Sequence, residues 1–475
     1  DIGNYLTQQQ KLEIIGDFSS VAGITLNDDW QIILPNEHND WINQRDDGFE
    51  KFIKIGSKKN KTQDNLFINY SSGIKTNRDF WCYNASRSKV ELNMREMINF
   101  YNEEVSRYQD SDKTIPPLEF INTDPKKISW DSAQKTGVAT GRTGAYKSET
   151  LTKSLYRPFS KSWLYYDHFF NNRVYQMPQI YPLANHPNLV IGITGIGESK
   201  GFTSLITDTL PNLHYVAGSQ CFPLYIYDKV QVDQLDIGTN DNIFYQKTES
   251  NKIDGYTRKD GISKTGFNHF QQAYPSETFS KEDIFYYIYG LLHSPEYRER
   301  YADNLSKELP RIPCVKDACD FWHFSQSGRN LAELHIDYET VDKYPATLDC
   351  GKNNIKQLTN EDFRVTKMKH PKEKNDEGKS VNDNSVIIYN HAITVRDIPE
   401  EAYEYIVNGK PAIEWVIERQ AVTTDKKSGI VNDANDWAIE TMNNPKYPLE
   451  LLQRVITVSL ETMKIVKSLP KLDID

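Results

Sequence analysis

Hydrophobic residues recur at helical spacing between residues 94 and 108. Steps of three and four residues place side chains on one face of an α-helix, so this spacing predicts a helix that packs one face against the rest of the protein. The positions that share it are Met94, Met97, Ile98, Tyr101, Val105 and Tyr108. Ile115-Pro116-Pro117 then breaks the pattern, because proline cannot continue a helix, and predicts a boundary near residue 115.

Residues 118–280 show a different pattern, in which short apolar runs are separated by Gly, Pro and Asn. Such runs are typical of β-strands joined by turns. The clearest are residues 163–166, 188–193 and 222–227. This part of the chain is therefore predicted to be rich in β-structure.

Helical patterns return after residue 280. Ser280 can cap one helix, and Ser294-Pro295 can begin a second, which Pro310 and Pro313 would end. Residues 367–384 are almost wholly polar, as in a solvated hairpin tip or a mobile loop. A final stripe at spacings of three and four residues, from Leu449 to Val466, predicts a long helix that packs along another.

Strands and helices do not alternate in regular βαβ order, which favours an α+β fold. We expect a mixed, sheet-rich core with segregated helices and a long C-terminal helix. The chain of 475 residues is long enough for several domains, and the pattern predicts three segments, residues 1–115, 116–313 and 314–475. The second segment would end in the helix pair.

Composition narrows the class of protein. The 56 Lys and Arg against 66 Asp and Glu give a net charge of -10, so a nucleic-acid surface would have to be a local basic patch. The five cysteines lack zinc-site spacing, which fits a reduced cytoplasmic location and predicts no metal. No apolar run approaches the roughly 18 residues of a membrane span. Because the chain begins with Asp1 and shows no signal sequence, we expect a fragment of a longer protein.

No catalytic residue is predicted. The stretch from Gly192 to Lys200 is rich in glycine, but Glu198 follows its last glycine where a phosphate loop requires Lys, and G-x-G-x-x-G is absent. A glycine-rich strand end is the alternative. His293, His323 and His335 lie in apolar surroundings and are interpreted as structural histidines.

Residues 132–162 contain six basic residues and one acidic residue, which gives a local charge of +5. The glycines at 137, 141 and 144 predict that its first half is a flexible loop. Basic side chains beside Gly and Thr favour phosphate binding, although an ordinary solvated loop has the same composition. The basic residues are Lys135, Arg142, Lys147, Lys153, Arg157 and Lys161.

A second polar group occupies residues 71–79, after a predicted strand at residues 65–70. Asn and Arg can form bidentate contacts with bases and Lys suits phosphate, so we expect Lys75, Asn77 and Arg78 at a DNA face. Trp81 and Tyr83 would pack beneath them on an exit strand. The alternative is structural, because Arg78 could form an ion pair with Asp79 that only braces the turn.

Several phrases together resemble one family, the type ISP restriction-modification enzymes of the LlaGI and LlaBIII kind, in their C-terminal target-recognition (specificity) region. The resemblance spans nearly the whole chain. The phrases are WQIILPNEHNDW (30–41), KTNRDFWCYN (75–84), YRPFSKSWLYYD (156–167), YYIYGLLHSPEY (286–297), LPRIP (309–313) and SGIVND (428–433). Three serines depart from the family pattern, which puts contacts there in doubt: Ser72, Ser160 and Ser162.

The resemblance implies a parent polypeptide that joins a nuclease, an ATP-driven DNA translocase and an N6-adenine methyltransferase to this region. Such a parent would use S-adenosylmethionine, ATP and Mg. The sequence lacks the methyltransferase signature N-P-P-Y and a Walker A loop, so this fragment is expected to need no cofactor and to be no enzyme by itself. Residues 1–115 would then be a linker and first lobe after the methyltransferase, 116–313 the target-recognition core and 314–475 a C-terminal α+β lobe.

The resemblance further implies that the chain recognises a short asymmetric site in double-stranded DNA and presents one adenine to the adjacent methyltransferase. The candidate DNA-binding residues are Lys75, Asn77, Arg78, Arg142, Lys147, Lys153, Arg157 and Lys161. Two rival functions are a nucleotide-binding enzyme that uses residues 192–201 and a carbohydrate-binding protein, since 12% aromatic residues could stack on sugars.

Overall fold

The computed structural model describes residues 9–10, 33–58, 64–183, 186–230, 252–351, 354–374 and 378–474. The first three residues of the phrase at 30–41 lie outside this description. The chain divides into two compact units, Asp1–Asp47 and Gly48–Asp475. In the first unit, Nε of Arg45 donates a hydrogen bond to the Asp40 carboxylate at 2.9 Å.

Two hydrophobic cores form in the second unit. Each core contains residues from before residue 115, from the middle segment and from after residue 313. Packing alone therefore does not separate the three predicted segments, and their boundaries stay a prediction. The several sheets, whose strand pairs are antiparallel except for β4 and β8, and the long helix α14 (Tyr447–Lys467) confirm the predicted α+β class.

A four-stranded sheet of order β3-β5-β4-β8 contains the last part of the predicted basic stretch, with Lys153, Arg157 and Lys161. Strands β4 (Leu151–Arg157) and β5 (Ser160–Tyr165) form an antiparallel hairpin. Strand β3 (Tyr83–Asn84) pairs with β5, and β8 (Leu210–Pro211) runs parallel to β4. The helix α3 (Arg87–Gln109) lies beside β5 and buries the predicted stripe from Met94 to Tyr108, which confirms that prediction.

A second sheet has the order β2-β9-β6-β7 and accounts for the glycine-rich stretch. Its strands are β2 (Ser71–Ser72), β6 (Val190–Ile193), β7 (Ser204–Thr207) and β9 (Gln220–Pro223). A Cβ at Gly192 would overlap the Tyr215 ring, and one at Gly195 would lie 2.5 Å from the Gly218 carbonyl oxygen. These glycines therefore permit close packing around a buried strand end.

Shorter elements complete the first two thirds of the chain. The strands are β1 (Ile53–Lys54), β10 (Tyr225–Lys229), β11 (Lys252–Ile253), β12 (Tyr256–Asp260) and β13 (Arg311–Ile312). The helices are α2 (Asp79–Cys82), α4 (Pro117–Phe120), α5 (Ser132–Thr140), α6 (Met177–Ile180) and α7 (Lys264–Ala273), with 3-10 turns η2 (Asp47–Lys51) and η3 (Ser148–Thr150).

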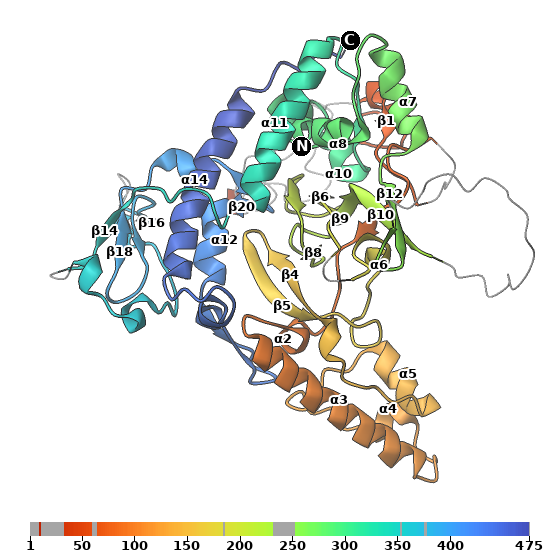
Figure 1. Ribbon diagram of the computed structural model, residues 1–475, viewed down its shortest axis with the longest axis vertical. Coiled ribbons are helices and arrows are strands. Elements are labelled where there is room, and N and C mark those ends of the chain that lie inside the picture. Colours follow the sequence, from red (N-terminus) through yellow and green to blue (C-terminus); the bar gives the residue numbers. More distant parts are fainter. Residues whose placement is uncertain are drawn as a thin grey trace, which may run out of the picture. The chain divides into compact units, whose positions relative to one another are not determined.

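The predicted helix pair begins as the sequence indicates. Ser280 and Asp283 form a capping box at α8 (Lys281–Leu291), and Ser294 caps α9 (Pro295–Arg300). The helix α10 (Ala302–Lys307) follows α9. The longer α11 (Ala318–Ile336) lies beside α8, as Figure 1 shows in green and teal. Together these helices cover the second core.

The C-terminal part places α12 (Ala412–Arg419) and α14 side by side (Figure 1). Within the polar residues 367–384, β15 (Lys372–Lys374) and β16 (Ser380–Asn382) pair antiparallel, as the interpretation of this segment as a solvated hairpin expects. The other strands are β14 (Thr347–Asp349), β17 (Ile387–Ile388), β18 (Thr394–Arg396), β19 (Ile406–Val407), β20 (Lys410–Pro411), β21 (Val422–Thr424) and β22 (Val431–Asp433).

Short helical turns connect these strands. They are η5 (Ile355–Gln357), η6 (Asn360–Phe363), η7 (Glu400–Tyr403), α13 (Ala434–Asp436) and the π-helix η8 (Trp437–Thr441). All five cysteines are free thiols. Among the described helices, none is both long enough and apolar enough to cross a membrane.

Two buried histidines lie near the end of α8, and one of them, His335, joins α8 and α11 to α14. His335 Nδ1 lies 2.6 Å from the Tyr289 hydroxyl, and its Nε2 lies 2.9 Å from the Thr462 hydroxyl. His293 donates through Nδ1 to the Tyr289 carbonyl at 2.8 Å. Burial and, less strongly, the charge of Arg298 lower the pKa of His335 to about 3. These two histidines are structural, as the sequence predicts, whereas His323 is exposed.

The depressed pKa of His335 predicts loss of stability in acid. The unfolded chain takes up the proton near pH 6.5 and the folded chain only near pH 3, so stability should be full above 6.5 and fall as pH decreases between these values. One such proton contributes a slope of about 1.4 kcal/mol per pH unit. Urea unfolding of the wild type and His335→Gln over this range should show a shallower slope in the variant. Equal slopes would contradict the assignment.

Candidate nucleic-acid interface

The predicted polar segment at residues 71–79 is held between strands and is not a free turn. Strand β2 pairs with β9, and the Ile74 amide donates to the Pro211 carbonyl at 2.9 Å. Lys75 exchanges two backbone hydrogen bonds with Arg173, at 3.0 and 2.9 Å. A Cβ at Gly73 would lie 2.5 Å from the Asn212 carbonyl oxygen, so this approach requires glycine.

Asn77 and its neighbours form the exposed end of this segment. Asn77 is exposed and has a φ of 56°, a left-handed conformation that Asn tolerates better than most residues. The Thr76 hydroxyl accepts from the Arg78 amide at 3.1 Å and donates to the Asp79 carboxylate. Trp81 and Tyr83 are buried as expected, but Trp81 lies in helix α2, so the predicted exit strand begins only at Tyr83.

Arg78 lies inside the protein, with 4% of its surface exposed. Its Nη2 donates to Gln134 Oε1 at 2.5 Å and lies 3.8 Å from the Asp131 carboxylate. Burial lowers its pKa, although Asp131 partly opposes this. The side chain therefore ties the segment to α5. The structure supports the structural alternative for Arg78, but with Asp131 as the acidic partner instead of Asp79.

Asp79 pairs instead with the end of the β4 strand. Its carboxylate accepts from the Tyr156 hydroxyl at 3.0 Å and lies 3.6 Å from Nη2 of Arg157. Nη1 of Arg157 donates to Asn212 Oδ1 at 2.9 Å, and the guanidinium lies 3.9 Å from the Tyr156 ring. Arg157 is thus fixed on three sides, as precise recognition requires.

His214 lies beside the same groups. Burial lowers its pKa, and the positive charges of Arg157 and Lys75 lower it further, against the opposing charges of Asp79 and Glu198. We call Lys75, Asp79, Arg157 and His214 the Arg157 cluster. It brings together three segments that are distant in the sequence, and two of the eight predicted residues, Lys75 and Arg157.

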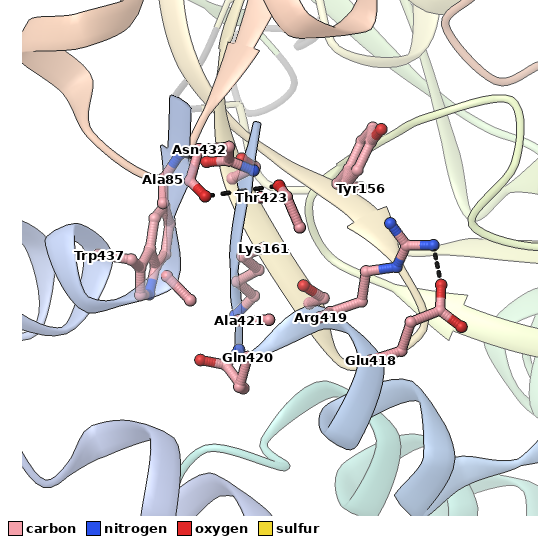
Figure 2. Close-up of a pocket in the computed structure, with 13 residues that line it drawn as sticks. Ala85, Tyr156, Lys161, Glu418, Arg419, Gln420, Ala421, Thr423, Asn432 and Trp437 are labelled. Carbon is pink, nitrogen blue, oxygen red and sulfur yellow. Dashed lines mark hydrogen bonds and ion pairs between the residues drawn. The ribbon is translucent and has the colours of Figure 1, made fainter. Parts of the chain in front are cut away.

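A small polar cavity of about 40 Å³ is lined by Tyr156, the residue whose hydroxyl donates to Asp79 (Figure 2). Figure 2 shows Arg419, at the end of α12, with its guanidinium paired to Glu418 and directed to the side where Tyr156 lies. Nε of Arg419 and Oε1 of Gln420 are buried without a hydrogen-bond partner among the described residues. Lys161 also lines the cavity, but Glu339 neutralises it at 2.7 Å.

The other predicted cations lie apart from the Arg157 cluster. Arg142 is exposed and lies 4.0 Å from the Phe169 ring, while its carbonyl accepts from the Tyr101 hydroxyl. Lys147, five residues after Arg142, is also exposed. Lys153 is exposed on β4, with Nζ 5.9 Å from the Trp163 ring and 5.8 Å from the Trp437 ring.

The prediction of a flexible loop in the first half of residues 132–162 is wrong for residues 132–140, whereas residues 141–147 form no helix or strand. Residues 132–140 form α5, which Asp131 caps by accepting from the Ser132 amide at 2.6 Å. Gly141 ends the helix at a φ of 71°. Gly137 is buried against the Tyr101 hydroxyl, where a Cβ would overlap it. These glycines therefore serve a helix end and a close contact, although composition alone suggested mobility.

Sequence reasoning missed Arg419 and His214. Arg419 ends an amphipathic helix and is followed by Gln420, with no motif around it, and only the fold brings it near Tyr156. His214 stands alone in its segment. Its neighbours Asn212 and Tyr215 do not form a spacing typical of a catalytic or binding motif. These residues could not have been found without the tertiary contacts.

Replacing Asn77 separates its backbone role from any contact with DNA. Asn77→Gly should keep the melting temperature near that of the wild type, because glycine adopts positive φ freely, whereas Asn77→Ala should destabilise by about 1 kcal/mol. If the Asn77 amide contacts a base, both variants should lose affinity for duplex DNA to the same extent. Thermal melting and a binding titration of both variants test this. Unchanged affinity of Asn77→Gly would leave Asn77 as a turn residue only.

The Arg157 cluster combines two cations, a carboxylate and a histidine from three segments of the chain. In the described part of the chain, no three His, Cys, Asp or Glu side chains are grouped to hold a metal ion. The family model of the Type ISP C-terminal specificity domain matches residues 65–451. Because the match covers most of the chain, the chain belongs to the Type ISP C-terminal specificity domain family. This confirms the resemblance predicted from the sequence.

Three solved structures resemble the chain along its length. A nuclease-deletion mutant of the Type ISP restriction-modification enzyme LlaGI, in complex with a DNA substrate mimic, is 35% identical with a TM-score of 0.80 over 100% of this chain and 39% of that chain. The ATP-dependent Type ISP restriction-modification enzyme LlaBIII bound to DNA is 35% identical, with a TM-score of 0.81. The match covers 100% of this chain and 28% of that chain.

The third structure is a DrdV-DNA complex, 28% identical with a TM-score of 0.75 over 97% of this chain and 42% of that chain. The chain thus spans less than half the length of each of these structures. No curated protein matches its sequence.

Proposed function

We propose that this chain recognises a short asymmetric sequence in double-stranded DNA as the specificity region of a longer Type ISP restriction-modification enzyme. The observation that carries the proposal is the similarity over 100% of the chain to LlaGI and LlaBIII, whose structures contain a DNA substrate mimic or DNA. The acidic net charge of -10 does not oppose it, because phosphate contacts need only a local basic surface.

The Arg157 cluster and the exposed cations Arg142, Lys147 and Lys153 are our candidates for the DNA contacts. Arg157 is braced by Asp79 and Asn212, so it loses little freedom when it binds. The exposed lysines are suited to phosphates, which fix the register of a protein on the duplex. Arg78, which is buried and paired, would then support the surface without touching DNA, and Lys161 would contribute less because Glu339 already neutralises it.

In the parent enzyme this chain would present one adenine to the adjacent N6-adenine methyltransferase. A methyltransferase reaches its target atom only after the base leaves the stack, so the recognition region would hold the flanking duplex while the adenine swings out. The methylation, translocation and cleavage steps, with S-adenosylmethionine, ATP and Mg, would belong to the rest of the polypeptide. A cytoplasmic location is part of the same proposal.

Selection from a pool of random duplexes tests the function and requires no assumption about which bases are recognised. The 475-residue chain is incubated with the pool, and bound duplexes are recovered and sequenced over several rounds. Enrichment of one short, non-palindromic sequence is expected. Recovery of no enriched sequence, from a chain that is folded by its melting curve, would contradict recognition of a specific site.

Lys75→Ala tests the place of the Arg157 cluster in that interface. Loss of a phosphate contact should weaken binding to specific and random duplexes alike and reduce the log-log salt slope by about 1. Lys464→Ala is the matched control, because Lys464 is a lysine on α14 with 76% of its side chain exposed. If both variants bind like the wild type, the DNA face lies elsewhere.

A further inference from the structure

A cavity of about 570 Å³ lies beside the β4–β5 hairpin, apart from the small cavity at Arg419. It is enclosed by the start of β4, by Trp163 of β5, by the segment around α6 and by the turn between β7 and β8. This volume is within the range of about 300 to 1,000 Å³ that small-molecule sites occupy. The contacts proposed above for duplex DNA leave this cavity without a role.

The cavity has aromatic walls and a polar rim. Trp163, Tyr166 and Tyr181 contribute rings. Asp208 contributes a carboxylate acceptor, and the Lys153 ammonium is a donor. A flat ligand that presents both donors and acceptors along its edge would match this combination, because its face can stack while its edge forms hydrogen bonds.

Two tyrosines that line the cavity have hydroxyl groups without a hydrogen-bond partner among the described residues. They are Tyr166 and Tyr181, whose hydroxyl oxygens are buried. Tyr181 is 4% exposed. Buried hydroxyls without partners are costly and uncommon in native proteins, so a polar group that reaches either oxygen through the cavity wall would stabilise it.

One residue that lines the cavity, Lys153, is also a candidate for phosphate contact. No carboxylate lies within ion-pair distance of this lysine in the described part of the chain. Thr150, also in the lining, donates its hydroxyl to the Lys147 carbonyl at 2.7 Å. An ammonium at the rim could therefore neutralise a phosphate attached to whatever enters.

We propose that this cavity binds a single nucleobase, stacked on its aromatic walls, with the attached phosphate near Lys153. The chemistry is that of a planar heterocycle carrying ring and exocyclic nitrogen atoms. Two sources share it, a base extruded from duplex DNA and a free nucleotide. The duplex source rests on the proposed function, while the free-nucleotide source does not.

Fluorescence titration with 2-aminopurine distinguishes these sources. The probes are a fully paired duplex, the same duplex with one unpaired 2-aminopurine, the same duplex with an unpaired abasic site, and free 2-aminopurine riboside 5′-monophosphate, called the riboside below. We expect the chain to prefer the unpaired 2-aminopurine roughly tenfold over both other duplexes, because stacking requires the base. The abasic duplex controls for flexibility at the bulge.

Thr209→Trp should fill the cavity and remove the preference while leaving the affinity for the paired duplex unchanged. Thr340→Trp is the matched control, since Thr340 is exposed and lies outside the lining. Should Thr209→Trp fail to fold, Tyr166→Phe removes one unpartnered hydroxyl without changing the volume appreciably. It should reduce the preference several-fold at an unchanged melting temperature.

The outcomes separate the two proposals. Preference for the unpaired base that Thr209→Trp removes supports the cavity with DNA as its source, and binding of the riboside alone, equally sensitive to that substitution, supports it with a free nucleotide. Equal affinity for all duplexes together with no riboside binding overturns the cavity proposal and leaves DNA recognition standing. If no duplex binds, the proposed function fails, and the riboside result alone decides the cavity.

Discussion

The 475-residue chain should bind duplex DNA without ATP, S-adenosylmethionine or metal, and the binding should weaken steeply with salt. Each neutralised phosphate contributes about 0.9 to the log-log slope, so about four to six contacts would reduce affinity roughly 10² to 10³-fold between 50 and 200 mM salt. The cations that could supply them include the exposed Arg142, Lys147 and Lys153 and the half-buried Lys75 and Arg157.

A filter-binding titration at several salt concentrations measures this slope. Arg142→Ala with Lys147→Ala should lower the slope by about two, since both side chains are exposed. Lys161→Ala should lower it less, because Glu339 already pairs with Lys161. A slope near zero, or no duplex binding at low salt, would contradict an electrostatic DNA interface.

The sequence predicted the fold best where the pattern was long and periodic. The stripe from Met94 to Tyr108 and the C-terminal stripe both form helices with the expected buried faces. The capping residues Ser280 and Ser294 also begin their helices as predicted. These features depend on the spacing of apolar residues and on capping hydrogen bonds between near neighbours, and both can be predicted from the sequence alone.

Residues 132–140 show where local composition misled. Three glycines and several threonines suggested a loop, but Gly137 is needed for contact with Tyr101 and Gly141 for the helix end. Intrinsic propensity is a weak preference that tertiary contacts override. The same holds for Gly192, whose place is set by Tyr215 in a neighbouring segment.

The candidate site was predictable only in part, because charge in a sequence does not reveal pairing. Lys75 and Arg157 do come together, through Asp79 and His214. Arg78 differs from them only by its burial against Gln134 and Asp131, residues more than fifty positions away. Arg419 reaches the same region from a helix near the other end of the chain. Such long-range pairs follow from topology, and no local motif encodes them.

Gly328→Ala should destabilise the protein strongly although alanine is the better helix former. Intrinsic propensity alone would stabilise α11 by about 1 kcal/mol. However, α8 and α11 cross at Gly290 and Gly328, and a Cβ at Gly328 would overlap the Tyr286 carbonyl oxygen. Because that atom is backbone, it cannot rotate away, and the two helices must separate.

That separation would open the second hydrophobic core. Phe324 and Leu331 on α11, and Tyr287 and Leu291 on α8, are fully buried there and would lose contacts together. Overpacking of this kind costs about 1 to 3 kcal/mol and occasionally more, and the upper end is expected where a rigid backbone atom blocks relaxation. Urea unfolding of Gly328→Ala should therefore show a large decrease in the free energy of unfolding.

The exposed Gln326→Ala on the same helix provides the control, since it removes only a surface hydrogen bond to Asn330. Its stability should stay within about 0.5 kcal/mol of the wild type. Gly290→Ala should behave like Gly328→Ala, because its Cβ would overlap the Phe324 carbonyl oxygen from the other side of the crossing. If Gly328→Ala is as stable as Gln326→Ala, α8 and α11 do not cross at these glycines, and the packing of the second core is different from the one described.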